Sequence, residues 1–502
     1  MELQKKKLMN LRPAVVISAG LIIGILIGYL YSFKSRRVSV FSFCLVFAIL
    51  LFAFTYSLFK KNRFNAVVSI FTTISCLVGL LVVREDINAS NTYRGEVSFH
   101  GEVVEIYEEN ISDIGYYYRL VLKGDVKNGN NARVYAEMSS SKRVFQGSKI
   151  SIQGDFTPTD PHSDFAFSTD IDYYALVDYD TVKVGKLNGA IPILKYKLLT
   201  TLEEFMPKTS SLVYALLTGE TTYVPRAVLV KYQDVGVAHL FAVSGLHVGL
   251  IYGLLLFLFK GLKLKGGIRF SLISFILFCY VGFCGFSASS MRAFIIITVR
   301  EIAFIFGLKP DKTTNLSISA FIVLIINPSD LFSAGFLLSF SVYLGLILLA
   351  TPFSKFLSKI FPEFISKMLS SCIVAHLVSF PILLDYFGEV SVFGFLFNMA
   401  LIPFVSFLYP FILLSSILLC VFQTSFFAIL PNLAFALPNK ALYLANTQLF
   451  MIRDFKLSYS CIFYYLFLYS FAGKINLSAK SYNILRIIIL LAFILTFSAI
   501  LY

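Results

Sequence analysis

The sequence lacks the cysteine patterns of a disulfide-stabilised or zinc-binding protein. Its seven cysteines all lie within or beside apolar runs, and none falls in the long polar segment between residues 84 and 190. Disulfide frameworks and zinc sites both show characteristic cysteine spacings. The chain also contains no Gly-x-x-x-x-Gly-Lys-Ser/Thr phosphate loop, which a nucleotide-driven motor would need. We therefore expect no metal and no cofactor.

Charged residues are scarce, and apolar ones dominate. Of 502 residues, 57% are hydrophobic, and the mean hydropathy is +0.77, whereas soluble domains are about 45 to 50% apolar. The composition predicts a polytopic membrane protein that is mainly α-helical. Lysines at 5 to 7 precede the first apolar run, so we expect an uncleaved anchor with its N-terminus inside. The membrane anchor helices expected in residues 1–83 lie at about 13–33, 38–59 and 64–83.

Residues 84–190 form a polar segment that differs in charge from the rest. They contain 11 Lys and Arg against 17 Asp and Glu, a net −6, and the remainder of the chain carries +20. Five stretches alternate with period two between glycine turns, which predicts a small external β-barrel. The expected strands are 95–107, 116–123, 132–137, 149–155 and 175–184.

Residues 191–235 have an amphipathic helical pattern without a run of spanning length, which predicts helices on the outer surface. They lead into a transmembrane domain at 236–502, in which basic residues occupy every second loop. This positive-inside pattern places His239, Ser244 and Arg292 towards the external side. The basic loops lie around 263–269, 309–312 and 355–367, and those without basic residues around 287–290, 328–330 and 385–389. Further apolar runs lie at about 426–450, 457–472 and 484–502.

Polar residues gather at 239–253, at the mouth of an apolar run that ends at Lys260. If the stretch is one helix, Ser244 and His247 lie opposite a narrow face of small residues, which would let a neighbouring helix approach closely. Histidine within a membrane normally faces water or a polar partner, so His239 and His247 are functional candidates. The alternative is interfacial histidines bonded to backbone. The small residues are Ala238, Ala242, Gly245, Gly249 and Gly253.

Several motifs between about 210 and 405 resemble those of one family. They are Leu-Leu-Thr-Gly-Glu at 216–220, Gly-Val-Ala-His-Leu-Phe-Ala-Val-Ser-Gly-Leu-His at 236–247, Ser-Ser-Met-Arg-Ala at 289–293, Gly-Phe-Leu-Leu-Ser-Phe at 335–340, and Asn398 with Pro403. Together they resemble the ComEC family of competence proteins, which carry transforming DNA across the inner membrane.

The resemblance implies a multi-pass inner-membrane channel for uptake of single-stranded DNA during natural competence, with an OB-fold domain as the polar segment. Because no motor is expected in the chain, an external DNA receptor and a cytoplasmic helicase are expected partners, besides membrane lipid. Residues that would line or shape the route are His239, Ser244, Gly245, His247, Gly249, Arg292, Ser339, Asn398 and Pro403.

Many relatives end in a metallo-β-lactamase-like domain that is thought to degrade one strand. Only His376 lies beyond His247, which leaves no place for three-histidine zinc chemistry. We therefore expect a form without that domain and a separate nuclease.

Single-strand binding by the polar segment would need aromatic stacking over a basic groove. Because consecutive tyrosines on a strand alternate faces, at least one of the three candidate tyrosines must be core. The acidic net charge is unfavourable for DNA, so a structural role of the segment is the alternative. The candidate contacts are Tyr116, Tyr117, Tyr118, Arg119, Lys123, Lys127 and Arg133.

Other interpretations stay open for the membrane residues. Arg292 is either an arginine that snorkels to the interface or a fork that grips a backbone phosphate. Asn398 and Pro403 interrupt an apolar helix, which predicts a path-lining site or simple buried packing.

Two other functions are also possible. One is a transporter for another polyanion or small solute, and the other is an intramembrane serine hydrolase that uses Ser244 and His247 with His376 from another span. We expect no enzyme, because a serine on a helix usually bonds the backbone one turn back.

Overall fold

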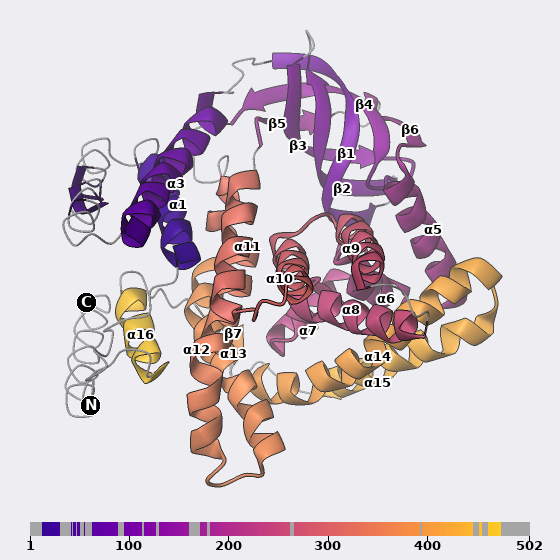
Figure 1. Ribbon diagram of the computed structural model, residues 1–502. Helices are drawn as coiled ribbons and strands as arrows, with labels where there is room; N and C mark the ends of the chain where they lie inside the picture. Colours follow the sequence, from indigo (N-terminus) through magenta and orange to yellow (C-terminus); the bar gives the residue numbers. More distant parts are fainter. Residues whose placement is uncertain are drawn as a thin grey trace, which may run out of the picture.

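The computed structural model is mostly helical, with one sheet domain (Figure 1). This confirms the prediction of a mainly helical chain with a separate β segment. The described residues are 13–30, 63–88, 95–112, 115–126, 130–159, 171–177, 181–261, 266–391, 394–444, 451–453 and 460–472, with isolated positions between 42 and 55. Of the predicted spans, 38–59 lies mostly and 484–502 wholly outside these residues.

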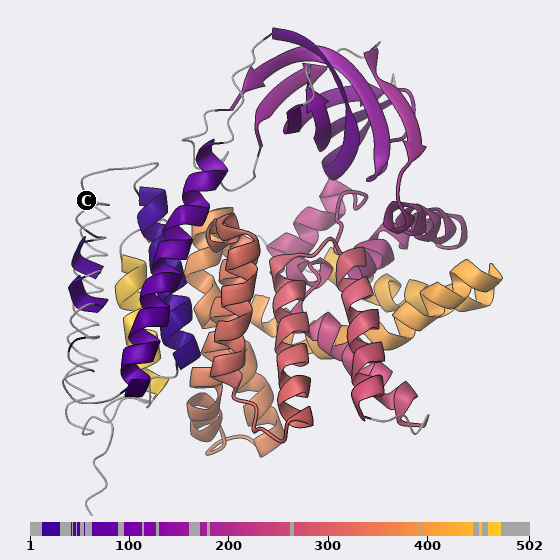
Figure 2. The ribbon, with the colours of Figure 1, turned by 45° about the horizontal axis from the view of Figure 1, so that its top comes forward.

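Helices α1 (Pro13–Tyr29) and α3 (Arg63–Asn88) pack side by side (Figures 1 and 2). Their backbones touch at glycines. A Cβ on Gly24 would lie 2.1 Å from the carbonyl oxygen of Cys76, and one on Gly79 would lie 2.6 Å from that of Leu21. Such close approach is how helices associate where no hydrophobic drive exists between them. Close packing at glycines, of the kind that the sequence predicts at 239–253, thus occurs between α1 and α3.

The sheet domain contains a closed ring of five strands. The strands pair in the order β1-β2-β3-β5-β4, and β4 pairs again with β1, while β6 extends from β4. Strands β3 and β5 run parallel, and the other pairs are antiparallel. Fully buried side chains such as Phe99, Leu120, Val134 and Phe156 fill the inside. The strands are β1 (Gly95–Ser112), β2 (Gly115–Val126), β3 (Asn130–Ser140), β4 (Ser148–Pro158), β5 (Tyr173–Val177) and β6 (Lys183–Leu187).

The first four predicted strands are confirmed, although all four are longer than expected. The single strand predicted at 175–184 is wrong, because β5 ends at Val177 and a separate β6 begins at Lys183. β5 pairs with both β3 and β4, whereas β6 pairs only with β4. The two strands therefore occupy different places in the sheet.

Three helices connect the sheet domain to the main bundle. They are α5 (Ala190–Phe205), α6 (Ser210–Thr218) and α7 (Arg226–Asp234). Helix α6 is almost wholly buried, with every residue from Leu212 to Thr218 covered. The expectation of a surface position does not hold for α6, because the helix is apolar nearly all round and has no polar face to present to water.

The main bundle begins at α8, and Figure 2 shows α9, α10 and α11 side by side below the sheet domain. Within the described residues, four helices are long and apolar enough to cross a membrane: Gly266–Phe283, Ala334–Leu357, Glu363–Phe387 and Phe397–Phe422. The helices are α8 (Gly245–Lys260), α9 (Gly266–Phe283), α10 (Ala288–Ile305), α11 (Lys312–Ile326), α12 (Ala334–Leu357), α13 (Glu363–Phe387), α14 (Gly394–Phe422), α15 (Ile429–Leu444) and α16 (Ser460–Tyr469).

The segment at 239–253 is not one helix, which corrects the prediction. A 3-10 turn covers Ala238–Phe241, Ala242 is extended, and α8 begins only at Gly245. A Cβ on Gly249 or Gly253 would meet nothing within 4 Å. These two glycines therefore do not pack against another helix of the described chain.

We predict that Gly24→Ala lowers the thermal stability of the purified protein, because the added methyl group would force α1 and α3 apart. Overpacking of this kind costs about 1 to 3 kcal/mol. The matched control is Gly249→Ala, which adds the same group to a helix with open space beside it. Thermal unfolding in detergent should show a lower midpoint for Gly24→Ala alone. Equal midpoints for the two variants would contradict the glycine contact.

Candidate functional site

Ser244 and His247 form a capping box at the N-terminus of α8. The Ser244 hydroxyl accepts a hydrogen bond from the Leu246 N–H at 3.3 Å, and the Ser244 N–H donates to His247 Nδ1 at 3.1 Å. The two side chains are 3.5 Å apart at Oγ and Nδ1. Because Nδ1 already accepts a backbone N–H, it has little capacity to take the serine proton. The pair therefore fixes the start of α8.

A chain of contacts runs from His247 into the bundle. The buried imidazole packs against the ring of Tyr409 on α14, with ring centroids 4.6 Å apart. The hydroxyls of Tyr409 and Tyr280 lie 2.7 Å apart, and Tyr280 also donates to the carbonyl oxygen of Leu217 at 3.5 Å. Helices α8, α14, α9 and α6 thus meet around one buried polar chain.

Arg292 is buried beside the first turn of α8. Its side chain is only 8% exposed, and a Cβ on Gly245 would lie 2.7 Å from one of its terminal nitrogens. The guanidinium donates to the Ser339 carbonyl oxygen and lies 5.1 Å from the ring of Tyr343. Its Nε has no hydrogen-bond partner, and no carboxylate in the described part of the chain forms an ion pair with it.

The position of this cation is unusual because a helix N-terminus already carries partial positive charge and free N–H groups. Arg292 and the start of α8 thus bring positive charge together in an apolar bundle. Ser339 also belongs to this group, since its hydroxyl donates to Ser289 at 3.0 Å. We call Arg292, Ser339 and the start of α8 the cationic corner. Such a corner has the features of an anion-binding site.

Asn398 and Pro403 lie on α14, next to the segment that leads into the site. The Asn398 amide approaches the Gly236 carbonyl oxygen at 3.5 Å, and its own Oδ1 is buried without a partner. Gly236 has a φ of 73° and lies against Gly394, so a side chain there would be both strained and obstructed. The structure brings Asn398 to the base of the 236–244 segment.

His239 lies in the 3-10 turn before α8, close enough to His247 for the two imidazoles to interact electrostatically. Its side chain is exposed, whereas its neighbours Leu240 and Phe241 are buried. Among the predicted residues, the structure thus gathers Ser244, Gly245 and His247 with Arg292 and Ser339. His376 lies on α13, where its backbone oxygen accepts from Ser379.

The sheet domain is fixed to the bundle through a buried ion pair. Lys195 on α5 is 5% exposed and pairs with Glu220, and it also donates to Gln146 of the sheet domain at 2.8 Å. Tyr214 donates to the other oxygen of Glu220 at 2.8 Å. Lys195 lies 5.8 Å from the ring centroid of Phe283, at the end of α9. The sheet domain therefore lies at the α9–α10 end of the bundle, opposite the basic loops.

A second contact joins the domain to α5. Arg143 pairs with Glu109 of β1 and with Glu203 of α5, both at 2.9 Å. Burial disfavours the charged guanidinium, but its bonds to the two carboxylates outweigh this, and the pKa of Arg143 is raised above its ordinary value. Thr222 donates to the Ile106 carbonyl oxygen at 2.5 Å. These contacts fix the domain above the bundle.

The predicted DNA contacts lie on β2 and β3 in two different environments. Tyr118 is fully buried, its hydroxyl donates to Glu109, and burial raises its pKa. This confirms that at least one of the three tyrosines is core. Tyr116 stacks beside it, with ring centroids 6.2 Å apart. Tyr117 donates to Glu137 at 2.9 Å.

The basic residues of this group are partly neutralised by acidic neighbours. Arg119 pairs with Glu108 at 3.2 Å and with Glu137 at 3.1 Å. Lys123 is exposed, Arg133 is half-buried, and Lys127 lies outside the described residues. A continuous basic groove is thus absent from the described part of this face.

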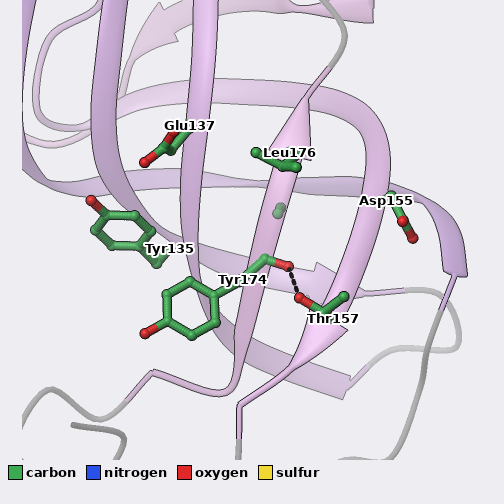
Figure 3. A pocket seen from close by; sticks show the side chains of 7 residues that line it. Tyr135, Glu137, Asp155, Thr157, Tyr174 and Leu176 are labelled. Atoms are coloured by element: carbon green, nitrogen blue, oxygen red, sulfur yellow. Dashed lines mark hydrogen bonds between the residues drawn. The ribbon is translucent and has the colours of Figure 1, made fainter.

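A shallow pocket of about 250 Å³ lies on the outer surface of β3, β5 and β4 (Figure 3). The rings of Tyr135 and Tyr174 lie edge to face at 5.7 Å on one side of it. Glu137 and Asp155 also line it, together with the exposed Leu176. No basic side chain lines the pocket. Its chemistry is therefore aromatic and acidic, which disfavours a phosphate.

The sequence does not predict the Lys195–Glu220 pair or a second polar group within the bundle. Tyr252 on α8 donates to Glu301 on α10, and Arg300 donates to both. A signal existed for this group, since adjacent opposite charges inside an apolar run are rare and usually functional. No cluster of three or more potential metal ligands occurs among the described residues.

The fold and the site define a helix-bundle protein with helices of membrane-spanning length and a small sheet domain fixed over a polar site at helix ends. The family described as Competence protein matches residues 216–476, more than half of the chain. The chain therefore belongs to the Competence protein family, which confirms the resemblance found in the sequence.

One curated relative supports this assignment. Over 221 residues the chain is 32% identical to ComE operon protein 3 of Bacillus subtilis (strain 168). The match covers 42% of this chain and 28% of that protein, so the chain spans less than two thirds of the relative's length. No solved structure matches the chain.

We predict that Ser244→Ala destabilises the protein by about 1 kcal/mol, because α8 loses its N-cap. Ser244→Asn should remain close to the parent, since asparagine is an equally good cap. Thermal unfolding of the purified variants measures the difference. Unchanged stability of Ser244→Ala would show that the capping box contributes nothing.

We predict a larger loss for Glu220→Gln, because it leaves the Lys195 ammonium buried without its counter-ion. Removing one partner of a buried pair costs about 3 to 5 kcal/mol. The double variant Lys195→Met, Glu220→Gln removes both charges and should recover most of the loss. Limited proteolysis at increasing temperature would compare the three chains. A double variant as unstable as the single one would contradict this role of the pair.

Proposed function

We propose that the protein is a multi-pass inner-membrane channel that admits single-stranded DNA during natural transformation. Membership of the Competence protein family and the four helices of spanning length support this function. The observation that carries it is the buried Arg292 beside the start of α8. A buried guanidinium that lacks a carboxylate is costly unless an anion joins it.

A phosphodiester fits this corner better than a neutral solute does. The planar guanidinium can bind phosphate oxygens in a fixed geometry, and the partial positive charge of the helix start adds to the attraction. Because every nucleotide carries the same phosphate, a contact of this kind positions a strand without reading its sequence. This property suits a channel for transforming DNA.

The sheet domain is proposed as an external, OB-like barrel over the mouth of the route. Its strand order, with β1 closing on β4, is consistent with a five-stranded barrel. Its acidic charge and neutralised arginines favour a structural role over strong DNA binding. An external receptor would then deliver DNA, a cytoplasmic helicase would supply energy, and a separate nuclease would remove the other strand.

The proposal assigns no catalysis to this chain. The serine hydrolase alternative needs His247 as a base, but its Nδ1 accepts the Ser244 N–H. Transport of another polyanion is the second candidate, because the cationic corner would bind any phosphate- or carboxylate-bearing polymer.

We predict that Arg292→Gln lowers entry of labelled single strands into the cytoplasm by at least tenfold, while DNA binding at the cell surface stays unchanged. Loss of one hydrogen bond to a charged group, about 1.5 to 3 kcal/mol, gives an effect of this size. Arg292→Lys should be intermediate, since it keeps the charge but loses the planar fork. The measurement is nuclease-resistant DNA, normalised to the amount of protein in the membrane.

The matched control is Arg226→Gln, which removes an arginine that is 81% exposed in its side chain. DNA should enter cells that carry this variant as it enters cells that carry the parent protein. Deletion of the gene tests the function itself, because continued entry without the protein would end the channel proposal.

A further inference from the structure

Helices α8 and α10 pack against each other along a seam. This seam carries a second cationic group, further from the N-termini of the two helices than Arg292. At its upper end, a Cβ on Gly245 would touch Ala293 at 3.5 Å. Seven residues further along each helix lie Tyr252 and Arg300, whose Nη2 donates to the Tyr252 hydroxyl at 3.2 Å. Seven residues are close to two helical turns, so this group lies about 10 Å deeper along the same seam.

Glu301 completes the group. Its carboxylate accepts from Tyr252 and from Arg300, the latter at 3.3 Å. The guanidinium of Arg300 also lies 5.3 Å from the ring of Tyr252 and 6.0 Å from that of Phe304. The arginine is thus held in place by two aromatic rings and one carboxylate.

Arg300 nevertheless keeps an accessible face. Its side chain is 42% exposed, whereas that of Glu301 is 21% exposed. The Arg300 Nε is buried and has no hydrogen-bond partner, so the exposed surface belongs to the other atoms of the side chain. A charged group inside an apolar helix is expensive and normally faces a water-filled path or a partner. The arginine is therefore the member of the group that is open to a ligand, and the carboxylate is the member that partly neutralises it.

We propose that Arg300 is a second phosphate-binding station for the DNA backbone, in the inner part of the bundle, with Tyr252 as its positioning residue and Glu301 as the carboxylate that weakens its binding of phosphate. This inference rests on the proposed channel function. A strand that leaves the corner at Arg292 would meet Arg300 along the same seam. Partial neutralisation by Glu301 keeps the binding weak, and weak binding at several sites allows passage.

The two members of the pair should behave differently in DNA entry. Arg300→Gln removes the phosphate contact and should lower entry by about tenfold. Glu301→Gln removes the neutralising carboxylate but keeps the phosphate contact, so entry should stay near the parent level. Arg300→Lys should fall between the parent and Arg300→Gln. All variants are measured as nuclease-resistant DNA per unit of membrane-inserted protein, in the full chain.

Arg269→Gln on α9 is the matched control, because it also removes one arginine from a bundle helix, and it should match the parent. Parental entry by Arg300→Gln would overturn the station while leaving the channel in place. Equal losses for Arg300→Gln and Glu301→Gln would assign the pair to packing alone. A parent with no more entry than the gene deletion would overturn the channel and the station together.

A second measurement covers the case in which Arg300→Gln inserts poorly. Arg300→Cys is treated with a charged, water-soluble thiol reagent, and modification of that peptide is read by mass spectrometry with and without a single-stranded oligonucleotide. We expect modification that the oligonucleotide slows. An unreactive thiol, or one that the oligonucleotide does not protect, would overturn the proposal.

Discussion

The site depends on one interaction, the contact between the Arg292 guanidinium and the start of α8. A Cβ on Gly245 would lie 2.7 Å from a terminal nitrogen of Arg292, so a side chain there would displace the guanidinium. In an apolar bundle this arrangement brings together charges of one sign, which costs free energy unless an anion is present. Three helices meet at the contact, because Arg292 on α10 bonds Ser339 on α12 beside α8. Under the proposed function, the phosphates of the passing strand would balance this charge.

The sheet domain follows from the same geometry. The helix ends near Arg292 face the side on which Lys195 joins Gln146 of the domain to Phe283 of α9. Because the Lys195–Glu220 pair is nearly buried, it holds this orientation against rotation, although buried pairs are weak sources of net stability. The domain is thus positioned over the helix ends that carry the cationic corner.

The sequence predicts local patterns better than contacts. Alternation identifies the four long strands, since one buried face fixes a period of two. It fails at β5 and β6, because short strands carry too few alternations to show a break. The helix start at Gly245 could have been read from Ser244, a good N-cap, yet the apolar run on both sides suggested one helix. The Arg143–Glu203 pair could not be predicted from the sequence, because no local pattern connects residues that are 60 positions apart.

The open flank of α8 bears on how a strand could pass the two arginines under the proposed function. Packing within the described chain gives no reason for glycine at 249 or 253, where an added methyl group would meet nothing. Glycine weakens a helix by about 1 kcal/mol relative to alanine. The proposed function explains this loss of helix stability, since glycines without side chains leave space beside the seam that Arg292 and Arg300 line. The arginines would hold the backbone, the glycines would leave room for the bases, and the pulling force would come from another protein.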